Sequence, residues 1–120
     1  MIHPKYIRTN RLIALFVLVL SFLVYYDTMA PSVSYWDCGE FIAVSYTLGV
    51  PHPPGSPLFL LLGRIASLLP FSEDIAFRVN LLSPLSSAFA VLFLYLIIVQ
   101  IVNHWRGKLD TNRDALIAFG

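Results

Sequence analysis

The strongest constraint on the fold is a run of about 25 residues, 79–103, that carries no formal charge. A helix over this run would be about 37 Å long, enough to cross a hydrocarbon core of about 30 Å with some tilt. Hydrophobic residues make up 58% of the 120-residue chain and charged residues only 12%, against about 25% in soluble domains. The sequence therefore predicts an all-α integral membrane protein with a transmembrane helix at 79–103.

A first transmembrane helix is predicted at 10–30. Its charge-free part, Leu12–Tyr26, would be about 22 Å long, and arginine side chains that reach back toward the interface would extend it. The alternative is a cleaved signal peptide, because a basic start precedes an apolar core and the small residue Ala30 follows. Pro31 directly after Ala30 makes that cleavage site unfavourable, which favours the transmembrane helix.

The charges predict an orientation. Basic residues precede the first helix and follow the second, whereas acidic residues gather in the 31–78 loop between them. By the positive-inside rule, both ends are cytoplasmic and residues 27–78 lie outside, in the periplasm if this is a bacterial inner-membrane protein.

Two short helices are expected in this loop, at about 35–48 and 57–69. The second is too short to span and has Arg64 near its centre, so it is expected to lie in the interface. The apolar residues 114–120 are expected to open a third helix, which would make the chain the amino-terminal fragment of a larger polytopic protein.

The external loop contains two carboxylates, Asp37 and Glu40, spaced three residues apart beside Trp36. Ionisable residues near a bilayer are costly and usually mark a functional site. On a helix starting near Ser34 and ending with Gly49 as a left-handed cap, both would share one face. Mutual repulsion and desolvation would then raise the pKa of one of them, as a general base requires. The structural alternative is an acidic first turn that stabilises the helix dipole.

Other polar residues of the loop are weaker candidates. His52 lies in a proline-bounded turn, where histidines are commonly only solvated. Arg78 is either an interfacial anchor or a phosphate ligand, and Arg64 either anchors its helix or pairs with Glu73 or Asp74. Cys38 has no partner at metal-ligand spacing and is expected to be a packing residue, so no metal site is predicted.

Four motifs carry a family resemblance: WDCGEF at 36–41, HPPGSPL at 52–58, LGR at 62–64 and FRVNLLS at 77–83. Together they resemble the amino-terminal part of a Bacteroidetes-type polytopic membrane family catalogued as a domain of unknown function. That family is related to a eukaryotic multi-spanning O-mannosyltransferase and more distantly resembles the GT-C glycosyltransferases. The resemblance implies a polyprenyl-phosphate sugar as donor and a hydroxyl group of an exported protein, a glycan or a lipid as acceptor. It leaves a divalent metal open without indicating one.

The same resemblance implies roles for individual residues. Asp37 would be the catalytic carboxylate and Glu40 its partner, while His52 and Arg78 would lie near the donor phosphate or substrate. Trp36 and Arg64 are predicted as further residues that bind the donor phosphate or substrate. A non-enzymatic scaffold or lipid-binding subunit is the alternative from another class. A transporter half is disfavoured, because neither Leu12–Tyr26 nor Val79–Asn103 contains an ionisable carboxylate, lysine or arginine. Nothing in the composition predicts nucleic-acid binding, since the net charge is only +1.

Overall fold

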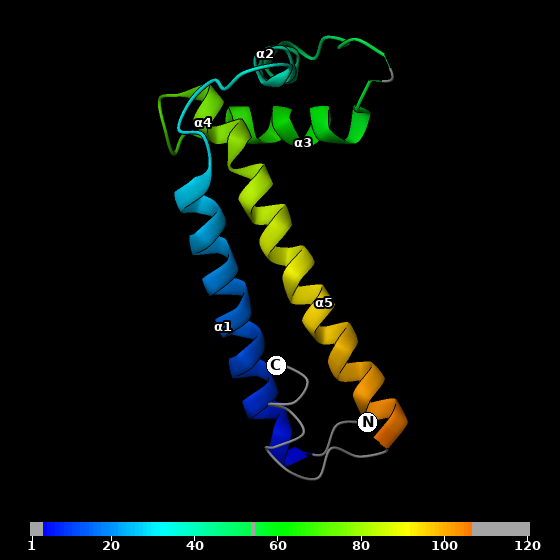
Figure 1. Cartoon of the computed structure of the whole chain (residues 1–120). Coiled ribbons are helices and arrows are strands. Elements are labelled where there is room, and N and C mark those ends of the chain that lie inside the picture. The colour runs from blue at the N-terminus through cyan, green and yellow to red at the C-terminus, as the bar shows by residue number, and fades with distance from the viewer. Residues whose placement is uncertain (1–3, 54, 107–120) are drawn as a thin grey trace. The chain divides into compact units, whose positions relative to one another are not determined.

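The structure is a computed structural model that describes residues 4–53 and 55–106, and these residues form helices and loops without a strand. The predicted all-α class is confirmed. The helices, shown in Figure 1, are α1 (Pro4–Thr28), α2 (Cys38–Thr47), α3 (Pro57–Leu68), α4 (Ile75–Asn80) and α5 (Leu82–Arg106). Two segments are long and apolar enough to cross a membrane, Ile7–Thr28 and Ile75–Trp105. The third helix expected at 114–120 lies outside the described residues.

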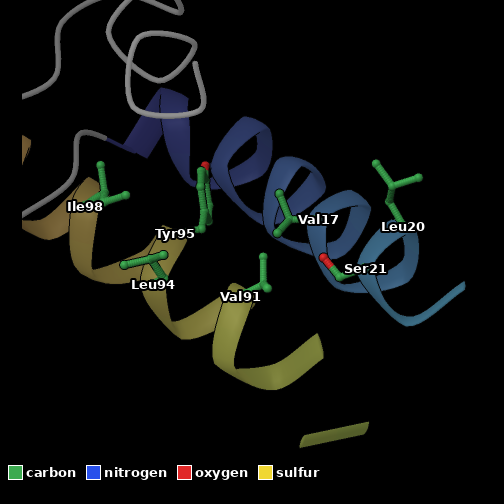
Figure 2. Close-up of a pocket in the computed structure, with 7 residues that line it drawn as sticks. All are labelled: Val17, Leu20, Ser21, Val91, Leu94, Tyr95 and Ile98. Atoms are coloured by element: carbon green, nitrogen blue, oxygen red, sulfur yellow. The ribbon is translucent and has the colours of Figure 1, made fainter. Parts of the chain in front are cut away.

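The chain divides into two compact units, and among the described residues the first combines α1 up to Tyr25 with α5 from Ser86 onward. Its core is the contact of Val17 on α1 with Tyr95 and Val99 on α5. The hydroxyl of Tyr95 donates a 2.8 Å hydrogen bond to Asn10 Oδ1, which adds a polar link between two otherwise apolar helices. A cavity of about 290 Å³ lies beside this contact, and Figure 2 shows that side chains of both helices line it.

The second unit, residues 26–85, holds α2, α3 and α4. α2 packs on both α3 and α4, and these two also pack on each other. In Figure 1 α2 is seen nearly end-on while α3 runs across the view, so the two helices cross. Their shared core consists of Ile42, Ala76 and Val79, with Phe59 and Ile75 packed against it.

Gly63 allows α3 to approach α2 closely. A Cβ atom on Gly63 would lie 2.8 Å from Ser45 Cβ and still closer to Ser45 Oγ. Ser45 itself is fully buried. The opposite side of α3 is exposed and apolar, with Leu58, Leu61, Ile65 and Leu68 more than half accessible. A helix with one packed face and one bare apolar face suits an interfacial position.

Both ends of α2 differ from the sequence expectation. The helix does not start near Ser34, because Trp36 adopts a left-handed backbone (φ 59°) and Asp37 becomes the N-cap. At the other end Leu48, not Gly49, is left-handed (φ 56°, ψ 38°), and the Gly49 N–H donates to the Val44 carbonyl at 3.0 Å. A Cβ atom at position 49 would lie 3.3 Å from Val44 Cγ1, a tight contact that would require a small shift of that side chain.

The helical segment expected at 79–103 is divided at Leu81. α4 begins at Ile75, where the Asp74 side chain caps the Ala76 N–H at 2.7 Å, and α5 begins at Leu82. Pro84 explains the interruption, because it has no N–H to donate to the carbonyl of Asn80 four residues earlier. The side chain of Asn80 also donates to the Ala30 and Ser32 carbonyls at 3.0 and 2.9 Å, which holds the segment that leads to α2.

Candidate functional site

The structure brings together Asp37, Glu40 and His52 of the predicted site residues. Glu40 lies in the first turn of α2, and its two carboxylate oxygens bind the same residue. Oε1 accepts the backbone N–H of His52 at 2.9 Å, and Oε2 lies 2.8 Å from His52 Nδ1. One carboxylate therefore fixes both the backbone and the ring of His52, an arrangement we call the Glu40–His52 clamp.

The turn that follows α2 places His52 for this contact. The Gly55 N–H donates to the His52 carbonyl at 3.1 Å, and Gly55 adopts a left-handed backbone (φ 72°) that closes the turn. Pro51 is buried beside it, and the His52 ring meets the edge of the Phe41 ring with centroids 5.9 Å apart. His52 is thus an oriented residue and not a freely solvated loop histidine.

Asp37 faces the free side of the imidazole. Its Oδ2 lies 3.8 Å from His52 Nε2, and 65% of its side chain is exposed. Although Asp37 is the N-cap residue of α2, its side chain makes no capping hydrogen bond. The carboxylate is therefore accessible to a ligand, while the helix start still offers favourable electrostatics for its negative charge.

The pKa of Glu40 shifts downward, so Glu40 is not the carboxylate of the pair whose pKa is raised. The hydrogen bond from the His52 side chain, together with that from its backbone, lowers the pKa of Glu40 below 4.5. The same side-chain hydrogen bond and the charge of Glu40 raise the pKa of His52 above 6.5. The physical reason is that His52, a partner able to carry positive charge, donates hydrogen bonds to Glu40 and outweighs the desolvation that would raise the pKa of this carboxylate.

Among the residues that the structure describes, Asp37, Glu40 and His52 are also the group that could hold a metal ion. One ligand atom of each lies within 4.8 Å of the other two. Both oxygens of Glu40, however, are occupied by His52. Asp37 and His52 Nε2 are then the available donors, fewer than the three or four protein ligands that zinc sites use. The arrangement fits a hydrogen-bonded cluster better than a metal centre, and the absence of a metal site stays a prediction.

A cavity of about 500 Å³ opens beside Asp37. It is mostly apolar, with Asp37 among a few polar groups, and its lining combines the start of α2 with parts of α3, α4 and α5 (Tyr35, Trp36, Asp37, Cys38, Phe41, Ile42, Phe59, Val79, Asn80 and Ser83). Trp36 is 95% exposed at its rim. Cys38, expected as a packing residue, is exposed and lines the cavity. An apolar hollow with a few convergent polar groups is typical of a small-ligand site.

The two arginines among the predicted site residues, Arg64 and Arg78, donate hydrogen bonds to backbone carbonyls outside the cluster of Asp37, Glu40 and His52. Arg64 donates to the Tyr46 carbonyl and lies 5.6 Å from the centre of the Tyr46 ring, so it pairs with neither Glu73 nor Asp74 in the described structure. Arg78 Nη1 donates to the Leu69 carbonyl at 2.8 Å, and its buried Nε has no hydrogen-bond partner there. Neither arginine lines the cavity beside Asp37.

Two features of the site were missed in the sequence. The Glu40–His52 clamp joins residues 12 positions apart, and no periodicity links a first-turn glutamate to a loop histidine. Asn80 holds the segment before α2 through side-chain hydrogen bonds. In the sequence, Asn80 stood out only as an amide in a largely apolar run. The proline and glycine residues on either side of His52 were the usable signal, because they indicate a fixed turn.

Comparisons with known proteins identify a family of relatives. Residues 37–119 match the family model of the protein O-mannosyl-transferase TMEM260 N-terminal domain. A protein O-mannosyl-transferase tmem260 of Dictyostelium discoideum is 36% identical over 110 residues, which cover 88% of this chain and 13% of that protein. The mouse protein O-mannosyl-transferase TMEM260 is 45% identical over 69 residues, 57% of this chain and 10% of that protein.

The matched part of the chain thus spans only 13% and 10% of the lengths of these two curated relatives. No solved structure matches it. The matched residues begin at Asp37 and include His52, Arg64 and Arg78, so the family model covers most of the candidate site. Because this model accounts for well over half of the 120 residues, the chain belongs to the TMEM260 N-terminal domain family.

Proposed function

We propose that the protein containing this chain is a GT-C-like membrane glycosyltransferase. In this proposal it transfers a sugar, specifically mannose, from a polyprenyl-phosphate donor to a hydroxyl group of an exported protein. The observation that carries this proposal is the exposed Asp37 carboxylate, backed by the Glu40–His52 clamp, at the edge of a cavity of about 500 Å³. The names of the related proteins support a sugar donor and a protein acceptor. Glycan and lipid acceptors are the alternatives to test.

In this proposal Asp37 is the general base. It accepts the proton of the acceptor hydroxyl while that oxygen attacks the anomeric carbon, and the bond to the lipid phosphate breaks with inversion. A positioned general base contributes about 10²–10⁴-fold, and alignment of the two substrates supplies much of the rest. Glu40 does not meet the substrates in this scheme, because His52 occupies both of its oxygens.

The membrane location follows the same proposal. The N-terminus is cytoplasmic and residues 27–78 face outward, which is the periplasm if the protein is from a bacterial inner membrane and a member of the domain-of-unknown-function family. The bare apolar face of α3 would then rest in the interface, with Leu58, Leu61, Ile65 and Leu68 toward lipid. This places the carboxylates near the headgroup level, where the phosphate of a lipid-linked donor would lie.

The test compares Asp37→Asn with wild type in the full-length protein. Labelled sugar transfer from polyprenyl-phosphate mannose to serine- and threonine-containing acceptor peptides is measured in proteoliposomes. We expect Asp37→Asn to abolish transfer without loss of membrane insertion, whereas Asp27→Asn, a matched exposed carboxylate at the end of α1, retains it. Full activity in Asp37→Asn would remove the catalytic assignment, and no transfer by wild type with any acceptor class would favour the scaffold.

A further inference from the structure

We propose that His52 is a positioning residue that receives, from Asp37, the proton taken from the acceptor hydroxyl, and that Glu40 holds it in the tautomer able to do so. This inference rests on the proposed function. It differs from the phosphate- or substrate-binding role that the family resemblance implies for His52. It depends on the geometry of three side chains, Asp37, His52 and Glu40, in that order.

The geometry gives each nitrogen of His52 a separate task. Nδ1 lies 2.8 Å from Glu40 Oε2, and a carboxylate can only accept a hydrogen bond there, so the neutral ring carries its proton on Nδ1. Nε2 is then left with a lone pair, and it faces Asp37 Oδ2 at 3.8 Å. That distance suits transfer through one water or after a small rotation of Asp37, whose side chain has no capping bond to hold it.

His52 provides a second proton acceptor next to Asp37. An imidazole binds protons near pH 6.5, and Glu40 raises the pKa of His52 further through its hydrogen bond and its charge. The charged groups that act on the ring are Glu40 and Asp37 of α2, and its other ring contact is Phe41.

The acceptor O–H bond breaks and its oxygen forms the bond to the anomeric carbon, while the lipid phosphate leaves with the electron pair of the old bond. The proton passes to Asp37 Oδ2 and then to the lone pair of His52 Nε2. The product is an imidazolium paired with Glu40, which later releases the proton to water. No oxidant, metal or third substrate is needed.

The kinetic test uses the full-length protein in proteoliposomes with polyprenyl-phosphate mannose and an acceptor peptide. Since neutral His52 is the active form, we expect kcat/KM of wild type to rise with pH through a midpoint above 6.5. Glu40→Gln should move this midpoint downward, because the imidazolium loses its charged partner. His52→Asn should lower kcat about 10²-fold and abolish the transition. His104→Asn and Glu73→Gln, both exposed and outside the cluster, should match wild type.

A second measurement does not require activity. Nitrogen NMR of the full-length protein labelled at histidine follows the titration of His52, assigned by its loss in His52→Asn. We expect a pKa above 6.5 that falls in Glu40→Gln. A titration indifferent to Glu40→Gln, or an unchanged pH profile in an active His52→Asn, overturns the proton transfer and leaves the catalytic role of Asp37 intact. If the wild-type protein itself transfers no sugar, that result counts against the proposed function.

Discussion

Glu40 is the residue whose contacts organise the candidate site, since its carboxylate holds both the backbone and the ring of His52. The lowered pKa of Glu40 means that its contribution to stability is present above its ordinary value of 4.5 and is lost as the pH falls through its folded value. The raised pKa of His52 means that its contribution is complete below 6.5 and is lost as the pH rises through its folded value. The clamp is therefore most stable between about pH 4.5 and 6.5.

This window predicts pH-dependent order in the turn that carries His52. Hydrogen exchange at the backbone amide of His52, corrected for the intrinsic pH dependence of exchange, should show greatest protection between pH 4.5 and 6.5 and less at pH 8. Glu40→Gln should remove most of this pH dependence, while Glu73→Gln should preserve it. Uniform protection of wild type from pH 5 to pH 8 would contradict the assigned roles of the two groups.

Arg78 predicts a separate effect on the donor. Its Nη1 donates to the Leu69 carbonyl, while its buried Nε has no hydrogen-bond partner in the described structure. We expect Arg78→Ala to raise the KM for polyprenyl-phosphate mannose about 10- to 100-fold, as the loss of a charged hydrogen bond would, with a smaller effect in Arg78→Lys. Kinetics at varied donor concentration measure this, with membrane insertion as the control. An unchanged donor KM would refute the phosphate role.

At the scale of helices, the crossing of α2 over α3 depends on the missing side chain of Gly63. Gly63→Ala would press a methyl group against buried Ser45 and should lower the free energy of unfolding by about 1–3 kcal/mol. Adding Ser45→Gly should recover part of this loss, because it removes both clashing atoms. Gly39→Ala is the matched control, since its Cβ would lie 3.4 Å from Val33 Cγ1.

Denaturant unfolding of the purified protein in detergent measures these variants. If Gly63→Ala were as stable as Gly39→Ala, the close approach of α2 and α3 would be wrong, and with it the position of the core formed by Ile42, Ala76 and Val79.

For the whole molecule, orientation in the membrane can be tested with the chain's single cysteine. Cys38 is exposed at the start of α2, beside Asp37. In a full-length protein whose other cysteines are replaced, Cys38 should react with a membrane-impermeant maleimide added to intact cells. His104→Cys in a Cys38→Ser background should react only after permeabilisation, because the end of α5 is predicted to be cytoplasmic. The reverse pattern would place the carboxylates on the cytoplasmic side and end the proposal of an external site.

Hydropathy predicts the architecture well here because the bilayer fixes the length of a spanning helix, so charge-free runs reveal α1 and α5. Helix ends were predicted less well. α3 begins at Pro57, as expected for a helix at about 57–69. Trp36 and Leu48, however, adopt left-handed conformations that favour glycine, and no residue pattern predicts these conformations. The pairing of Glu40 with His52 arises from the shape of the intervening turn, which sequence spacing does not determine.

The two left-handed residues that flank α2, Trp36 at φ 59° and Leu48 at φ 56°, have a consequence for ligand binding. Left-handed residues on both sides limit how far this short helix can rotate about its own axis, so the direction of Glu40 is set when the protein folds, while the Asp37 side chain can still turn toward His52 or a ligand. Substrates would meet a helix that needs little rearrangement, and the backbone strain at Trp36 and Leu48 would be the cost of that preorganisation.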